Sequence, residues 1–126
     1  MTDEQFSFGA MCEECVNYII KVQPTLERIS NDLRTAPSRD LLGELVGFEE
    51  GLSWLVSFGS KSDIFLPDDE LKSEFAFFVS QIDQGSRDFV VALENGDYLD
   101  LADVIDYEFL PALIRMRDTV APLVPH

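Results

Sequence analysis

The pair Cys12-Glu13-Glu14-Cys15 is the most recognisable arrangement of reactive side chains in the sequence. A redox-active pair needs a thiolate that is stabilised by a helix N-terminus or by nearby positive charge. The two glutamates between the thiols oppose that ionisation, and a structural zinc site would need two more ligands. Cys15 falls on the apolar stripe of the first expected helix, and Cys12 falls at its margin. We therefore predict that both cysteines are small buried hydrophobes.

Histidine and carboxylate positions limit the catalytic chemistry. The single histidine is His126, so a Ser-His-Asp or Cys-His arrangement cannot be assembled inside the chain. Di-iron bundles use Glu-x-x-His pairs, and none occurs here. Glu49, Glu50, Asp103 and Asp106 would converge only if the second and fourth helices packed with those edges facing. We read them as a solvated acidic face and predict no catalytic residue, no metal and no cofactor. A carboxylate-dependent metal enzyme remains an alternative.

The net charge separates classes of partner. The 126 residues include 9 Lys and Arg against 24 Asp and Glu, which gives a formal charge of -15. Such a field repels phosphate backbones and anionic lipid head groups, so nucleic acid and membrane surfaces are not expected as ligands. Basic protein surfaces are attracted by the same field.

The cytoplasm is the expected location. No apolar run approaches the roughly 18 residues that span a bilayer. The start Met1-Thr2-Asp3-Glu4 is acidic and lacks the basic segment of a signal peptide. Reduced thiols fit the same compartment.

Three- and four-residue apolar spacing predicts four amphipathic helices in a single domain, 1–126. The expected helices cover about 10–34, about 39–58, a segment from about 67–70 to Asn95-Gly96, and a last segment after Asp97 that fades before Pro122. Ser38 and Asp97 are the expected caps, with 59–69 as the longest loop and a bend possible at Gly85. The fold class is all-α, an up-down antiparallel four-helix bundle with proline kinks at Pro24 and Pro111. The alternative is an array of five or six shorter helices, broken at those prolines.

Several apolar side chains fall away from the core stripes of these helices. Trp54, Phe77, Leu110 and Ile114 project to other faces, and Tyr107 lies in an acidic stretch. Residues 88–108 hold seven acids and no base, and Asp103 and Asp106 lie beside Tyr107. An apolar strip rimmed by acids suits a basic amphipathic helix. The alternative is that a kinked bundle buries these side chains within the monomer. The predicted partner-binding residues are Trp54, Phe77, Asp103, Asp106, Tyr107, Leu110 and Ile114.

Residues 92–111 carry a recognisable local pattern. A helix end is followed by the turn Asn95-Gly96-Asp97, and then by an acidic helix with Asp106-Tyr107-Glu108 and Pro111. The pattern resembles the C-terminal signature of small acidic helical proteins of unknown function in Gram-positive bacteria, which implies no activity. More distantly, it is similar to flagellin-export chaperones, which are small helical bundles that hold a secreted partner.

We therefore hypothesise a non-enzymatic, protein-binding module, adaptor-like or chaperone-like, that holds a basic or amphipathic helix. An acidic decoy or immunity-type inhibitor of a basic protein site is an alternative, and it would present acids on a face without apolar residues. A symmetric homodimer that hides the extra apolar surface is a further possibility.

Overall fold

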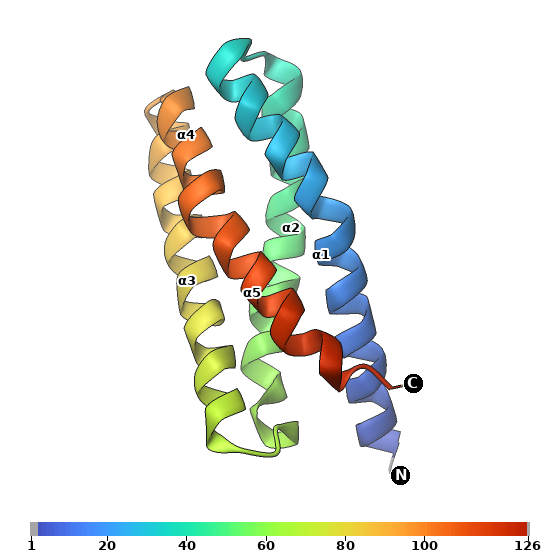
Figure 1. The fold of residues 1–126 in the computed structure, drawn as a ribbon. Helices are drawn as coiled ribbons and strands as arrows, with labels where there is room; N and C mark the ends of the chain where they lie inside the picture. Colours follow the sequence, from blue (N-terminus) through green and yellow to red (C-terminus); the bar gives the residue numbers. More distant parts are fainter. Residues whose placement is uncertain (1–2, 126) are drawn as a thin grey trace.

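The chain forms a four-helix bundle, and this confirms the expected all-α class (Figure 1). The computed structural model describes residues 3–125, apart from the side chains of residues 3–7 and 39; Met1, Thr2 and His126 lie outside the described residues. The helical elements are α1 (Asp3–Thr35), α2 (Arg39–Lys61), a 3-10 turn (Ser62–Phe65), α3 (Asp69–Glu94), α4 (Tyr98–Val104), a π-helical turn (Ile105–Phe109), α5 (Leu110–Val120) and a 3-10 turn (Ala121–Leu123). The π-helical turn joins α4 to α5, so these two elements together make the fourth rod of the bundle.

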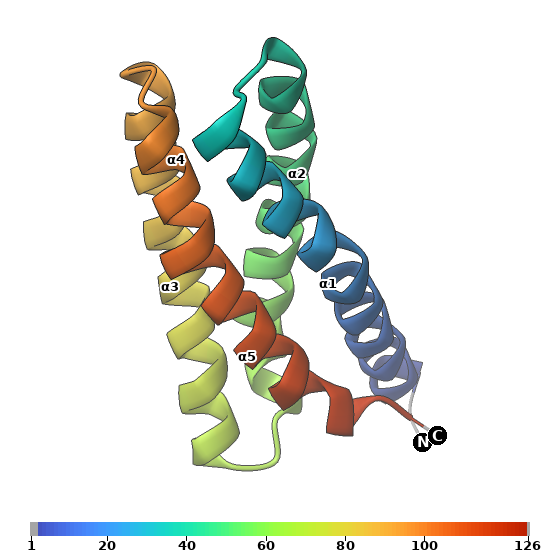
Figure 2. The same ribbon diagram turned by 45° about the horizontal axis from the view of Figure 1, so that its top comes forward.

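Consecutive rods run in opposite directions around the bundle (Figures 1 and 2). α2 packs mainly on α3, α1 packs mainly on α4 and α5, and α3 packs on α2 and on the fourth rod. α1 and α2 make fewer contacts with each other, although a short connection joins them. A groove lined by residues of both helices lies between α1 and α2.

Aromatic side chains fill two regions of the core. One surrounds Phe58, which is 1% exposed and stacks on Trp54 with ring centroids 5.5 Å apart. The other surrounds the fully buried Phe109, whose centroid lies 5.4 Å from Phe48 and 6.1 Å from Phe89. Rings at these separations gain stacking or edge-to-face attraction in addition to the burial of apolar area. The two aromatic groups stabilise the bundle along its length.

The proline in α1 does not end the helix. α1 continues through Pro24 to Thr35, so the alternative of a chain broken at this proline is wrong. α2 also extends to Lys61, and the end of α2 together with the following 3-10 turn occupies residues 59–65 of the expected loop 59–69. Tertiary packing outweighs local propensity at both places.

The caps of the later helices depend on aspartates. Asp68 Oδ1 accepts a hydrogen bond from Leu71 N at 2.8 Å, and Asp97 Oδ1 accepts one from Asp100 N at 3.0 Å, which confirms the Asp97 cap. Ser38 stands at the first position before α2, but its side chain makes no capping hydrogen bond. Ser38 therefore occupies the expected N-cap position, but the prediction that its side chain caps the helix is wrong; the negative charge of Asp40 lies in the first turn, where it favours the helix start.

The turn between α3 and α4 is closed by Gly96. Its φ of 64° is left-handed, a conformation that glycine adopts without steric cost. Asp97 N donates to Ala92 O at 3.0 Å, and Gly96 N donates to Leu93 O at 3.1 Å. These two bonds form a Schellman motif, which satisfies the last carbonyls of α3 and directs the chain back along the bundle.

The π-helical turn explains an error in the expected contact surface. Leu110 N donates to Ile105 O, five residues back, directly before Pro111, which has no N–H to offer. In a regular α-helix, residues four positions apart are offset by about 40° around the helix axis. The π-helical turn contains more residues per turn, so it reduces this offset. Leu110 is consequently 8% exposed and belongs to the core, so it was wrongly placed in the contact set. The core residues aligned by the turn are Leu101, Ile105, Phe109 and Leu113.

Candidate functional site

A groove of about 370 Å³ lies between α3 and α4, and we call it the acidic groove. Buried Ala92 and Val104 form its apolar base, and Val91 and Tyr107 are its exposed apolar side chains. Carboxylates complete its lining: Asp88 from α3, Asp100 and Asp103 from α4, and Glu108 from the π-helical turn. Among the described residues, no Lys or Arg lines this groove. The site combines apolar area with an excess of acidic side chains.

Tyr107 projects from the groove because of its place in the π-helical turn. The turn directs Ile105 and Phe109 into the core and leaves the Tyr107 side chain 72% exposed. Val91 on the opposite wall is 57% exposed. An aromatic ring and a β-branched side chain facing solvent beside carboxylates form a surface that can bury apolar area and attract cations.

Two carboxyl groups of the groove hold protons more tightly than usual. Burial, a hydrogen bond with Asp88 and the charge of Asp88 raise the pKa of Glu108 to about 7. The charge of Asp97, partial burial, a hydrogen bond with Asp97 and the charge of Asp103 raise the pKa of Asp100. Like charges without a neutralising base destabilise the ionised form. A cation placed in the groove would relieve this repulsion.

The raised pKa of Glu108 predicts a decrease in stability as pH rises. The native state holds a proton on this carboxyl between its ordinary value of 4.5 and about 7, and the unfolded state does not. Stability therefore falls across that window and levels off above it. Glutamine cannot ionise, so Glu108→Gln should gain stability relative to the wild type as pH rises. We expect the difference in melting temperature, variant minus wild type, to be larger at pH 8 than at pH 5. Thermal unfolding of both proteins at the two pH values measures this, and a constant difference would contradict the assignment.

Asp103 and Asp106, the two acids of the predicted partner-binding set, both pair with Arg34 within the monomer. Arg34 Nη2 of α1 lies 2.7 Å from Asp103 Oδ1 and 2.8 Å from Asp106 Oδ2. The buried Ser30 hydroxyl donates to Asp106 Oδ1 at 2.7 Å. Asp106 therefore connects the fourth rod to α1 and does not line the acidic groove. Asp103 lies between the two environments, since it both pairs with Arg34 and lines the groove.

Trp54 and Phe77 lie on other sides of the bundle. Trp54 is partly buried against the core and lines a small hollow with Glu14, Tyr18 and Gly51. Phe77 is 44% exposed, and the Arg115 guanidinium lies over its ring at 4.4 Å from the centroid. Arg115 also makes a two-bond contact with Glu74 at 2.8 and 2.6 Å. The guanidinium already covers one face of the Phe77 ring.

The seven predicted residues therefore do not form one surface. The structure brings Asp103 and Tyr107 together in the acidic groove, places half-buried Ile114 on α5, and buries Leu110. Sequence reasoning did not assign Asp88, Val91, Asp100 or Glu108 to the contact set. These residues are brought together by the alignment of α3 with α4 across the turn at Gly96. Helical periodicity alone does not determine that alignment. A clue was present in the four-residue spacing of Leu101, Ile105, Phe109 and Leu113, which is wider than one α-helical turn.

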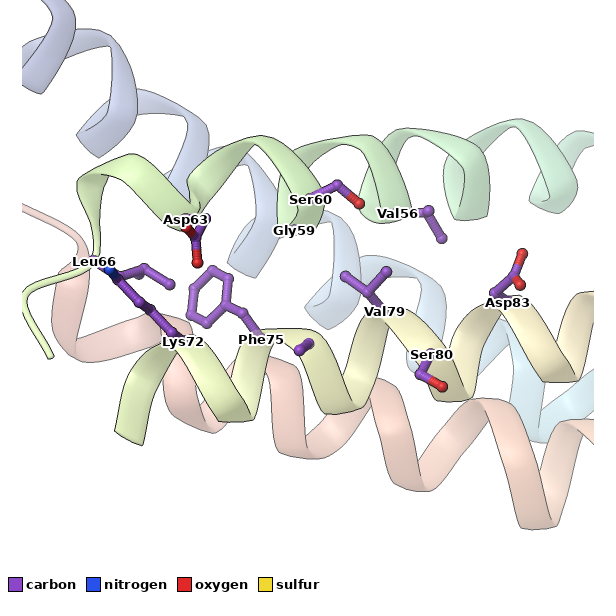
Figure 3. A pocket seen from close by; sticks show the side chains of 11 residues that line it. Val56, Gly59, Ser60, Asp63, Leu66, Lys72, Phe75, Val79, Ser80 and Asp83 are labelled. Carbon is purple, nitrogen blue, oxygen red and sulfur yellow. The ribbon is translucent and has the colours of Figure 1, made fainter. Parts of the chain in front are cut away.

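Another hollow, of about 550 Å³, lies between α2 and α3 (Figure 3). Phe75 and Val79 of α3 point toward α2, and the Lys72 side chain extends toward Leu66 at one end. Val79 fits where Gly59 leaves room, since a β-carbon at Gly59 would overlap the Val79 side chain. Its acids, Asp63 and Asp83, share the lining with Lys72, so charge in this hollow is mixed. It lacks the one-sided charge of the acidic groove.

The cysteines are buried, as predicted. Cys12 and Cys15 are both free and fully shielded. Burial raises the pKa of Cys12 to about 11, and burial together with Cys12 raises that of Cys15 to about 12. Thiols of this kind are poor nucleophiles near neutral pH.

Among the described side chains, those of residues 8–38 and 40–125, no three His, Cys, Asp or Glu groups come together in a way that could hold a metal ion. No helix in the described part of the chain is long and apolar enough to cross a membrane.

Fold and groove together define an acidic, all-helical bundle protein with a carboxylate-lined groove beside an exposed tyrosine. A family model described as a domain of unknown function, DUF8042, matches residues 10–119. The chain belongs to this family, and the matched region includes all four rods of the bundle. No curated protein and no solved structure matches the chain.

Proposed function

We propose that this protein is a non-enzymatic binding module, adaptor-like or chaperone-like, that holds a basic amphipathic helix in the acidic groove. The observation that carries the proposal is Tyr107, which is 72% exposed in a groove whose described lining holds four acidic side chains and no Lys or Arg. A partner helix would place apolar side chains on Tyr107 and Val91 and its Lys or Arg side chains on the acidic rim. The cytoplasm is the proposed location.

Charge across the rest of the chain supports a basic partner. Arg28, Arg34, Arg87, Arg115 and Arg117 all pair with acids of the same chain. Most of the excess negative charge is therefore left for solvent or for a partner. Complementary charge speeds the encounter of two proteins and selects against acidic partners.

Replacing Tyr107 with alanine tests the proposal. The probe is a fluorescein-labelled synthetic peptide that forms an amphipathic helix with leucine on one face and lysine on the other. We expect Tyr107→Ala to weaken binding about tenfold, as for loss of a central aromatic contact. Fluorescence anisotropy gives the Kd, and circular dichroism checks that the variant remains helical.

Phe77→Ala is the matched control, because it removes an exposed aromatic ring outside the groove. Its Kd should equal that of the wild type, and raising the salt should weaken peptide binding by the wild type. Equal Kd values for Tyr107→Ala and the wild type would contradict the proposed site.

A further inference from the structure

Glu108 lies against α3 at a position where that helix has no side chain. A β-carbon placed on Gly85 would lie 3.5 Å from Glu108 Cβ, so the Glu108 side chain starts directly over Gly85. Asp88 follows Gly85 by three residues and stands on the same face of α3. Gln84 Nε2 donates to Asp88 Oδ1 at 3.1 Å and holds the Asp88 carboxyl in place. The half-buried side chains of Glu108 and Asp88 therefore meet in the acidic groove, and a hydrogen bond joins them.

None of the described bases contacts this pair of carboxyl groups. The other titratable groups of the groove are Asp100 and Asp103 of α4 and the phenol of Tyr107. The arginines of the neighbouring elements pair with acids other than Asp88 and Glu108; they are Arg28, Arg34, Arg87, Arg115 and Arg117. Lys21 and Lys72 line other hollows. The pair is therefore surrounded by acids and lacks a neutralising partner within the described part of the chain.

A proton takes the place of the missing positive charge. Burial and the neighbouring Asp88 raise the pKa of Glu108 to about 7. The pair therefore shares one proton below neutral pH and carries two negative charges above it. The ammonium group of a lysine beside the two carboxyls would stabilise the doubly ionised pair instead. Because a proton and a basic side chain favour opposite states of the same pair, each weakens the binding of the other.

We propose that a basic partner competes with this proton, so that binding in the acidic groove releases the proton from Glu108 to solvent and strengthens as pH rises. The inference rests on the proposed function, because it concerns the same groove and the same class of partner. Lysines of the partner stay charged across this range, so the change in protonation lies on the protein. The affinity should rise up to about pH 7 and level off above it, where the free protein has already lost the proton.

Calorimetric titration with the leucine–lysine peptide tests the proposal. The peptide is unlabelled and has blocked ends, since a free amino terminus titrates near neutral pH. We expect a Kd about tenfold lower at pH 8 than at pH 5.5. At pH 6, comparison of two buffers with different ionisation enthalpies should show release of about one proton per bound peptide. Equal Kd values at the two pH values, without proton release, would overturn the proposal.

Glu108→Gln removes the group that holds the proton. Its Kd should change less than about twofold over the same pH range, and binding should release no proton at pH 6. Glu50→Gln is the matched control, because it removes the same charge from an exposed position of α2 outside the acidic groove. The control should keep the pH dependence of the wild type. A Glu108→Gln variant that also keeps it would show that another group carries the effect and would overturn the assignment.

The free protein provides a test of the shared proton without any peptide. Carbon NMR follows the side-chain carboxyl groups, and the Glu108 signal is identified by its absence in Glu108→Gln. Its titration midpoint should lie well above the ordinary value of 4.5, and saturating peptide should lower it. An ordinary midpoint in the free protein would overturn the inference, whatever the peptide does.

Tyr107→Ala separates failure of this inference from failure of the proposed function. If the wild type does not bind the peptide at pH 8, or if Tyr107→Ala binds it equally well, the proposed site is wrong and the proton coupling is wrong with it. If Tyr107→Ala weakens binding but the wild-type Kd does not vary with pH, the groove is the binding site and only the proton coupling is wrong.

Discussion

Replacing Phe109 with alanine should lower the free energy of unfolding by about 3–5 kcal/mol, the usual cost of removing a buried phenylalanine. Phe109 is fully buried in the π-helical turn and contacts the rings of Phe48 and Phe89. Its removal deletes apolar burial and leaves a cavity where α3 and the fourth rod meet. Urea denaturation, with helix content followed by far-ultraviolet circular dichroism, measures the change in the free energy of unfolding.

Phe77→Ala provides the comparison for this result. The Phe77 ring is 44% exposed and lies under Arg115, so its loss removes one cation–π contact and partial burial. We expect a cost of about 1 kcal/mol or less. Similar losses for the two variants would show that Phe109 does not hold the centre of the bundle.

Gly85→Val should lower the free energy of unfolding by about 3 kcal/mol, the upper part of the range for overpacked cores. Gly85 is buried in α3, and a β-carbon there would lie 2.8 Å from Phe109 Cε1 and 3.1 Å from Cδ1. The ring has little freedom to move, because Phe48 and Phe89 pack against it. A valine would push the π-helical turn away from α3, and thermal or urea unfolding would report the loss.

Gly43→Val is the matched control. The same substitution on α2 meets open space, so only helix propensity changes and the stability should rise by about 0.5 kcal/mol. A loss of stability at both glycines would indicate that the valine side chain, and not the contact with Phe109, causes the effect at Gly85.

Most of the fold followed from apolar periodicity and from turn residues. Gly96 ends one helix through its left-handed φ, and Asp97 begins the next through its capping carboxylate. Both signals are local, so the sequence alone reveals them. The expected helix over about 10–34 already contained Pro24, and the 33-residue helix α1 does continue past this one missing N–H. Local signals predict a boundary well when no tertiary packing opposes them.

The site was less predictable, because it depends on a change of helix type. A helical wheel assumes a constant angle per residue, and the π-helical turn breaks that assumption between Ile105 and Phe109. Leu110 consequently turned inward, while Tyr107 remained outside as expected. The meeting of Asp88 with Glu108 joins residues twenty positions apart on two rods, so it requires the three-dimensional register of those rods.

Burial of Cys12 and Cys15 changes what their presence says about the surroundings of the protein. Both sulfurs are sealed beneath neighbouring side chains and remain protonated near neutral pH. Packing therefore guards them from oxidants and alkylating agents whatever the redox potential outside. Their survival as thiols is a property of the bundle interior, and it carries no information about the compartment in which the chain resides.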